Sequence, residues 1–137
     1  MIVLDTNVLS EPLRPRPDPG VLRWIGRQAE IGTTAITVGE LLVGLARLPP
    51  GRRRDQLTVA MEQTLDQFRD NVLSYDQRAA HAYARLSVRR REAGAPLSVE
   101  DGMIAAICSV HRCALATRNA RDFGGLDLVL VNPWEQI

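Results

Sequence analysis

The chain has no lysine among its 137 residues, and all 17 basic residues are arginine. Any mechanism that requires a catalytic lysine is therefore excluded, including that of response-regulator receiver domains. No GKS or GKT sequence is present, so a P-loop nucleotide site is also excluded. An aspartate-nucleophile phosphatase is disfavoured because Asn7 stands where a second aspartate would follow Asp5.

Cysteines and aromatic residues are scarce. Cys108 and Cys113 are too few for a disulfide framework, and no Cys or His pair stands near them at zinc-ligand spacing. Aromatic residues make up 4% of the chain, which disfavours a stacking platform as the main way of binding single-stranded nucleic acid. The formal net charge is only +1, so the overall charge does not indicate a nucleic-acid partner.

Long hydrophobic runs are absent. No apolar run approaches the ~20 residues needed to span a bilayer, so we expect no membrane association. The first residues lack the charged segment and apolar stretch of a signal peptide, so a cytoplasmic protein is expected. With 45% hydrophobic and 24% charged residues, the composition is that of a globular protein, and residues 1–137 are expected to form a single domain.

Short apolar runs alternate with segments of helical periodicity. Strands are predicted at residues 2–4, 33–37, 71–76, 113–117 and 126–132. Helices are predicted at residues 21–29, 39–48, 54–69, 79–92 and 102–110, with a proline-rich loop over 12–20. This alternation predicts an α/β fold with a short, mostly parallel central sheet flanked by helices. Ligands of such sheets bind beyond the carboxyl ends of the strands.

Three acidic residues stand where helices are predicted to begin beside the sheet. Asp5 follows the first strand, Glu40 lies in TVGE and Asp101 lies in SVED. Each has a structural explanation, because Asp5 can cap the helix that follows it, and the other two acids match capping boxes with Thr37 and Ser98. Both explanations stay open, since a carboxylate can cap a helix and also bind a metal.

A parallel sheet brings these three carboxylates towards one edge. Converging like charges raise one another's pKa unless a cation lies among them. Oxygen ligands without His or Cys suit Mg²⁺ or Mn²⁺, which can lower the pKa of bound water and stabilise the charge that develops in phosphodiester cleavage. A fourth ligand is left open between the amide oxygen of Asn119 and Asp122, which can instead cap a turn.

Four segments of the sequence resemble the motifs of the PIN domain, in the order of that family. They are LDTNVLSE, TVGELLVG, VEDGMIAAICSVH and ATRNARDF. The match is to the VapC-type ribonuclease toxins, and the DTNVLSEPLRPRP opening and the NPW ending resemble the FitB-like branch. The resemblance spans almost the whole chain. It implies an α/β/α sandwich, a metal-dependent endoribonuclease that forms a homodimer, and inhibition by a small DNA-binding antitoxin in a larger complex.

The resemblance also implies roles for individual residues. The acidic and supporting polar positions of the family fall on Asp5, Glu40, Asp101, Thr6, Asn7 and Thr117. The fourth acidic position falls on Asn119, and this departure weakens a second metal site unless Asp122 compensates. In this scheme Asp5, Asp101 and Glu40 are the metal ligands, and Asp5 and Asp101 are the first candidates for direct contact with the ion. Glu40 can also orient or deprotonate the attacking water.

Arginines near these motifs are candidates for contact with RNA phosphates. Arg118 adjoins the last motif, and Arg14 and Arg16 flank the proline-rich loop. Trp24 and Trp134 are expected in the core or at an interface. The predicted helices at 39–48 and 54–69 can offer an apolar groove to an antitoxin helix.

A run of three arginines, Arg52, Arg53 and Arg54, opens a predicted helix. Positive charge at a helix N-terminus opposes the helix dipole, so helix stability does not explain the run. Contact with RNA phosphates and a simple solvated helix start both remain open.

A function of another class also remains open. In that alternative the chain is a catalytically weak or silent PIN-like partner of a DNA-binding antitoxin or repressor, and its carboxylates only cap helices. The amide at Asn119 favours this alternative, whereas the three intact acids favour the nuclease. Only a measurement of activity separates the two.

Overall fold

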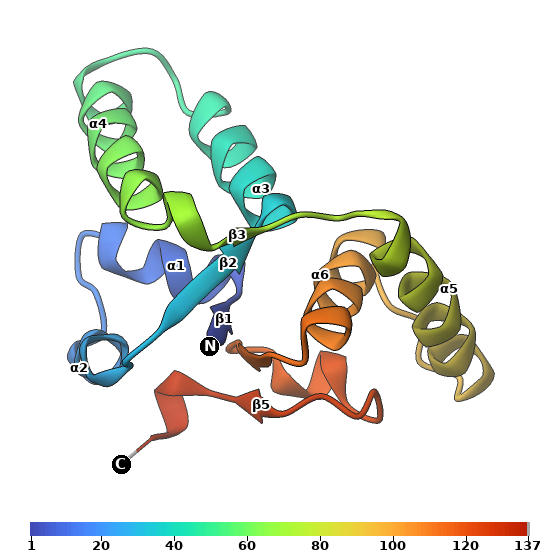
Figure 1. The fold of residues 1–137 in the computed structure, drawn as a ribbon. Coiled ribbons are helices and arrows are strands. Elements are labelled where there is room, and N and C mark those ends of the chain that lie inside the picture. Colours follow the sequence, from blue (N-terminus) through green and yellow to red (C-terminus); the bar gives the residue numbers. More distant parts are fainter. Residues whose placement is uncertain (137) are drawn as a thin grey trace.

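The computed structural model describes residues 1–136 and has a five-stranded sheet with helices on both faces (Figure 1). The strands are β1 Ile2–Leu4, β2 Ile31–Thr34, β3 Val72–Leu73, β4 Ala114–Ala116 and β5 Leu130–Val131. Their order across the sheet is β3-β2-β1-β4-β5, and each neighbouring pair is parallel. The predicted α/β class with a mostly parallel sheet is confirmed.

The helices divide between the two faces of the sheet. They are α1 Thr6–Ser10, α2 Pro19–Arg27, α3 Ala35–Ala46, α4 Arg52–Gln67, α5 Gln77–Glu92 and α6 Val99–His111. Short 3-10 helices lie at η1 Glu11–Leu13, η2 Arg69–Asn71, η3 Ala120–Phe123 and η4 Pro133–Glu135. Figure 1 shows α1 to α4 on one side of the sheet and α5 with α6 on the other. Within residues 1–136, no helix is long and apolar enough to cross a membrane.

The hydrophobic core follows from the alternation of side chains along β1 and β4. Successive residues of a strand point to opposite faces. Val3 and Leu115 pack with Ile104 of α6 on one face, while Leu4 and Ala116 pack with side chains of α1 to α4 on the other. These strand residues are fully buried. A sheet covered on both faces needs continuous apolar strands, which explains the short apolar runs of the sequence.

Some predicted boundaries were wrong. The strand predicted at 33–37 ends at Thr34, and the following residues form the first turn of α3. The Thr34 hydroxyl accepts a hydrogen bond from the Thr37 N–H at 3.1 Å, so Thr34 caps the helix and the capping box predicted for Thr37 with Glu40 does not form.

The other differences lie at the edges of the sheet and in the proline-rich loop. The edge strands β3 and β5 are two residues long, shorter than the predicted 71–76 and 126–132, because each forms only a short ladder with one neighbour. Within the segment 12–20, Asp18 caps α2 with Pro19 in its first turn, so the helix starts inside the predicted loop.

The strand order places several chain segments at one edge of the sheet. The connections run outward from β1 to β2 and β3, and then cross to β4 and β5. A reversal of this kind creates a crevice beyond the carboxyl ends of the strands. Asp5 follows β1 and Thr117 follows β4 at this point, and α6, which leads into β4, begins at the same edge.

Candidate active site

Asp5 is a buried carboxylate held by the two central strands. Its side chain is 5% exposed, and its backbone N–H donates to the Ala116 carbonyl at 2.9 Å. Oδ1 accepts a hydrogen bond from the Thr6 N–H at 2.8 Å, so Asp5 caps α1. Capping is one of the two roles that the sequence predicts for this residue. Oδ2 accepts from the Thr117 hydroxyl at 2.7 Å. Asp5 therefore combines a capping role with a fixed orientation at the crevice.

Thr117 links Asp5 to the loop that follows β4. Its side chain is fully buried, and its hydroxyl oxygen accepts a hydrogen bond from the Asn119 N–H at 3.1 Å. Since the hydroxyl hydrogen is donated to Asp5, the same oxygen holds both the carboxylate and the turn of the loop. This contact explains physically why a threonine stands at the end of β4.

Glu40 reaches the site from α3. It is exposed and lies in the second turn of the helix, so capping does not account for it once Thr34 is identified as the cap. The Thr6 hydroxyl donates to Glu40 Oε1 at 2.8 Å and lies 3.3 Å from the hydroxyl of the buried Thr37. Thr6 is thus the residue that connects Glu40 to the segment containing Asp5.

Asp101 stands in the first turn of α6. The Ser98 hydroxyl accepts a hydrogen bond from the Asp101 N–H at 3.1 Å, so Ser98 caps this helix as predicted. Gly102 beside it lies against α5, where an added Cβ would come within 2.7 Å of a ring carbon of Tyr83. No pattern in the residues predicts this close approach, which brings α6 and its acidic first turn against α5.

The carboxylates at this edge act on one another electrostatically. Burial raises the pKa of Asp5, and the charge of Glu40 raises it further, against the hydrogen bonds from Thr117 and Thr6. Burial also raises the pKa of Asp101, followed by the charges of Asp5 and Asp122. A cation bound among these carboxylates would favour their ionised forms and lower the pKa values that burial and like charges raise.

The donor set fits a hard divalent cation in its chemistry, since it consists of carboxylate and amide oxygens. Within residues 1–136, no three His, Cys, Asp or Glu side chains stand close enough to form a ready-made ligand group. The predicted acids thus act on one another by charge at this edge, but they do not form a ready-made group of three metal ligands within residues 1–136.

Asn119 lies on the β4–η3 connection, and Asp122 lies in η3. The Asp122 N–H donates to the Asn119 carbonyl at 2.9 Å, which closes the turn. The side chains of both residues, with that of Arg118, line a polar cavity of about 440 Å³ beside the site. The charge of Asp122 acts on Asp101, whereas the capping bond predicted as an alternative for its side chain is not formed in the described chain.

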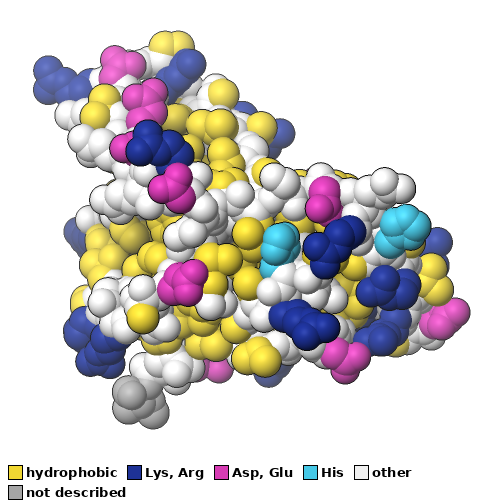
Figure 2. Space-filling model, in the orientation of Figure 1, with side chains coloured by type: hydrophobic (Ala, Val, Ile, Leu, Met, Phe, Trp, Pro, Cys, Tyr) yellow, Lys and Arg dark blue, Asp and Glu magenta, His cyan; other side chains and the backbone are white. Residues whose placement is uncertain are grey.

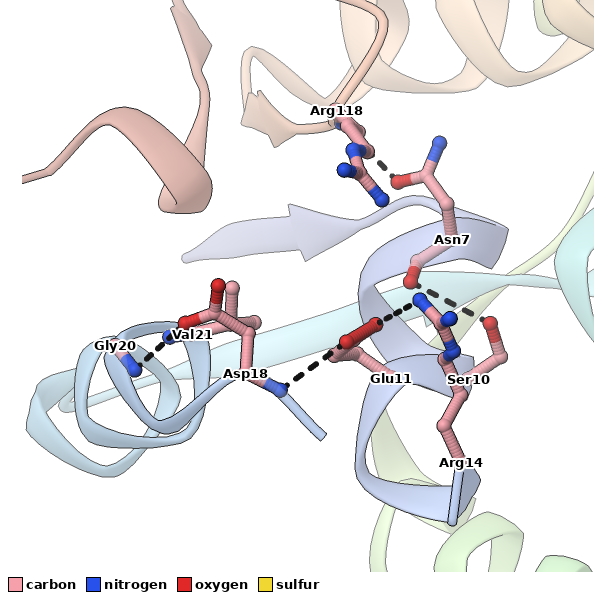
Figure 3. Close-up of polar contacts among 8 residues, drawn as sticks. All are labelled: Asn7, Ser10, Glu11, Arg14, Asp18, Gly20, Val21 and Arg118. Atoms are coloured by element: carbon pink, nitrogen blue, oxygen red, sulfur yellow. Dashed lines mark hydrogen bonds and ion pairs between the residues drawn. The ribbon is translucent and has the colours of Figure 1, made fainter. Parts of the chain in front are cut away.

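Asn7 and Arg118 join α1 to the same connection. The Arg118 N–H donates to Asn7 Oδ1 at 3.1 Å, a contact drawn in Figure 3. Sequence reasoning missed two further partners of Arg118. The Asn132 side-chain amide donates to its carbonyl at 3.3 Å, and its guanidinium carbon lies 4.9 Å from the ring centre of Trp134.

The predicted arginines are distributed around the site. Arg14 forms an ion pair of 3.3 Å with the buried Glu11, whose other oxygen accepts from the Asp18 N–H (Figure 3). Arg53 lies with Arg14 in a groove that reaches Glu40. The remaining arginines predicted to contact RNA are Arg16, Arg52 and Arg54. Within residues 1–136, none of them forms a side-chain hydrogen bond or ion pair with the site.

An apolar groove leads away from Glu40 between α3 and α4. It has a volume of about 410 Å³, and its polar end is formed by Thr6 and Glu40. Its apolar lining consists of Leu13, Leu41, Leu45, Leu48, Leu57 and Met61. Figure 2 shows hydrophobic side chains gathered between α3 and α4. The predicted groove between these helices is therefore present.

Comparison with known proteins gives consistent matches over the full length. The family model described as PIN domain matches residues 2–127. The chain is 42% identical to the plasmid stability protein StbB of Pseudomonas syringae and 37% identical to the toxin FitB of Neisseria gonorrhoeae. It is 40% identical to the VapC ribonuclease Y4jK of Sinorhizobium fredii. Each alignment covers 98% of this chain and 99% of the relative.

The structural comparison agrees. The chain superposes on a protein of the FitAB complex bound to a DNA fragment with a TM-score of 0.95 and 36% sequence identity. The match covers 100% of this chain and 98% of that one.

Proposed function

Because the chain belongs to the PIN-domain family, and to its VapC-type members, we propose that it is a metal-dependent endoribonuclease. In this proposal it is the toxin of a VapBC-like toxin–antitoxin pair, acts in the cytoplasm and functions as a single domain. The observation that carries the proposal is the buried Asp5, held by Thr6 and Thr117 and coupled by charge to Glu40 and Asp101. The names of the relatives, a toxin and a ribonuclease, agree with it.

Asp5 and Asp101 are proposed to bind the metal, Mg²⁺ or Mn²⁺. Glu40, Asn119 and Asp122 are further candidate oxygen donors. A bound divalent ion would stabilise the charge on the scissile phosphate and lower the pKa of water in the site. The elevated pKa values of both aspartates support this assignment, because a cation favours the ionised forms that burial disfavours.

Glu40 is proposed to accept a proton from the attacking water. The Thr6 hydroxyl holds Oε1 at 2.8 Å, which orients the carboxylate and leaves Oε2 free of protein donors in the described chain. Glu40 is exposed, so it retains access to water and to substrate. Thr6, Thr117 and Asn7 then act as positioning residues that fix the acids and the β4–η3 connection.

The RNA substrate is proposed to reach the site across its arginines. Arg118 is exposed on one side of the carboxylates, and Arg14 and Arg53 line the groove on the other. These guanidinium groups can neutralise phosphates that flank the cleaved bond. Arg14 keeps its ion pair with Glu11, so its contribution is smaller than that of Arg118.

The antitoxin is proposed to place an amphipathic helix in the groove between α3 and α4. The groove is apolar along most of its length and ends at Glu40, so a helix seated there would also cover the site. The chain is similar to a protein of the FitAB complex, and that complex is bound to DNA, which agrees with a DNA-binding antitoxin as the partner.

A homodimer is proposed through the outer face of α3. Leu42 and Val43 are 46% and 49% exposed on this helix, and Gly39 and Gly44 leave its backbone accessible. An exposed apolar helix face of this kind is typical of an interface with another protein.

The proposal is tested by incubating antitoxin-free protein with mixed RNA in Mg²⁺ or Mn²⁺, beside an EDTA control. Asp5→Asn is the active-site variant, and Asp70→Asn, an exposed acid distant in sequence from the motifs, is its matched control. Cleavage that EDTA and Asp5→Asn abolish and Asp70→Asn preserves supports the nuclease. Folded protein that cleaves none of the RNAs supports the silent binding partner, which the amide at Asn119 favours.

A further inference from the structure

The polar cavity beside the carboxylates lies between η4 and the segment formed by the β4–η3 connection and η3. Its volume is about 440 Å³. It is lined by Arg118, Asn119, Ala120, Arg121, Asp122, Asn132 and Glu135. It adjoins the site through Thr117, which binds Asp5 with its hydroxyl and accepts the Asn119 N–H. A group bound in this cavity would therefore be the immediate neighbour of a group bound at Asp5.

Arg118 is held in this cavity at three points. Its N–H donates to Asn7, its carbonyl accepts from Asn132, and its guanidinium lies over the indole ring of Trp134. Trp134 is itself partly buried against the core of the sheet, and the Asn132 side chain caps its turn at 3.0 Å. Arg118 remains exposed, so a guanidinium already ordered against an indole ring keeps a side open to a ligand.

The cavity offers both donors and acceptors. The side chains of Arg118, Arg121, Asn119, Asp122 and Glu135 form no side-chain hydrogen bond or ion pair within residues 1–136. The two arginines are matched by two carboxylates, so the lining has no excess positive charge. A site for phosphate alone would carry such an excess, whereas a nucleobase needs a stacking surface and a mixture of donors and acceptors at its edge.

We propose that this cavity is a base-binding subsite for the nucleotide next to the cleaved phosphate. The base stacks on the Arg118 guanidinium, and Glu135 and the NH₂ group of the Asn119 side chain contact its edge. A carboxylate pairs best with a base that presents two adjacent N–H donors, which favours guanine. This inference rests on the proposed RNA cleavage for the nature of the ligand, but binding can be measured without cleavage.

The test uses ¹⁵N-labelled protein in EDTA, where no metal-dependent cleavage takes place. The chain has two tryptophans and so gives two indole N–H signals, which Trp134→Phe assigns. The four nucleoside 5′-monophosphates are titrated separately, with inorganic phosphate as the anion control. GMP is expected to shift the Trp134 signal and leave that of Trp24 in place, with an affinity about tenfold above that of the other nucleotides.

Two variants separate stacking from edge recognition. Arg118→Lys keeps the charge and loses the planar group, and we expect GMP to bind about tenfold more weakly. Glu135→Gln should still bind nucleotides but lose the preference for GMP over AMP. Arg78→Lys, an exposed arginine of α5 on the other face of the sheet, is the matched control and should change neither. The unshifted Trp24 signal verifies that each variant is folded.

Several results would overturn the inference: no nucleotide shifts the Trp134 signal, phosphate alone reproduces the shift, or Arg118→Lys binds GMP as the parent does. Failure of the proposed ribonuclease is a separate result, read from the cleavage assay. Protein that binds GMP at Trp134 without cleaving RNA retains the base subsite and loses the nuclease. Protein that cleaves RNA but binds no base in this cavity retains the nuclease and loses the base subsite.

Discussion

The Thr117 hydroxyl donates a hydrogen bond of 2.7 Å to Asp5 Oδ2 across a sequence separation of 112 residues. Both side chains are buried, so the carboxylate depends on this donor for one of its two oxygens. The bond fastens the end of β1 to the end of β4, which is the point where the strand order reverses. It thereby joins the fold of the sheet to the geometry of the candidate active site.

Replacing Thr117 by valine should reduce both stability and activity. The substitution keeps the shape of the side chain but leaves a buried carboxylate oxygen without its donor, which typically costs about 1–3 kcal/mol. The free energy of unfolding is measured with urea, and RNA cleavage is measured at a temperature where the variant is folded. Thr117→Ser, which keeps the hydroxyl, is the control. Equal losses for valine and serine would contradict a role for the hydrogen bond.

The pH dependence of stability follows from the elevated pKa of Asp101, which burial raises most and the charge of Asp5 raises next. An acid whose pKa is higher in the folded chain binds more protons when folded. Its stabilising contribution is therefore complete below the unfolded-state value, near 3.8, and is lost as the pH rises through the folded-state pKa.

In EDTA at pH 7, Asp101→Asn should therefore unfold at higher urea concentration than the parent protein. Its advantage should shrink as the pH is lowered towards 3.8, the ordinary value of the group. Excess Mn²⁺ should stabilise the parent more than the variant, because only the parent retains the charged ligand. If the variant is less stable than the parent at pH 7 without metal, the ionised Asp101 carboxylate does not destabilise the folded chain.

Gly102 should be intolerant of even a methyl group. In Gly102→Ala the added Cβ would approach Tyr83 Cε2 to 2.7 Å, so α6 must move away from α5. Overpacking of this kind costs about 1–3 kcal/mol, and the shift would displace Asp101, so both the urea midpoint and cleavage should fall. Gly26→Ala is the control in α2, where no atom lies within 4 Å of the added Cβ. It should be neutral or stabilise by about 0.5–1 kcal/mol.

The sequence predicts the alternation of strands and helices because each element carries its own periodicity. It also predicts that Asp5, Glu40 and Asp101 belong to one edge, since the carboxyl ends of parallel strands meet there. The prediction for the cap of α3 was wrong because Thr34 and Thr37 are both suitable capping residues. The residue at which β2 ends decides which of them caps the helix. The contacts of Arg118 with Asn132 and Trp134 depend on the path of the last turn, for which periodicity gives no signal.

The hydrogen bond from Thr6 to Glu40 should matter for catalysis and little for stability. Glu40 is exposed, so in Thr6→Val water can replace the lost hydrogen bond to its carboxylate. The free energy of unfolding should therefore change by less than about 1 kcal/mol. The orientation of the carboxylate is lost, and the cleavage rate should fall about tenfold or more. Thr6→Ser should retain the parent rate. If valine and parent cleave RNA equally fast, Glu40 is not oriented through Thr6.

The groove between α3 and α4 should distinguish antitoxin binding from catalysis. Leu57→Glu puts a charge into the apolar lining, so a helix that buries this surface would have to desolvate it, and binding should weaken by about a hundredfold. Val59→Glu on the same helix is the matched control, since Val59 is 55% exposed and is absent from the groove lining. The measurement is neutralisation of RNA cleavage by the antitoxin candidate encoded beside the gene. Neutralisation of Leu57→Glu at the concentration that suffices for Val59→Glu would place the antitoxin elsewhere on the molecule.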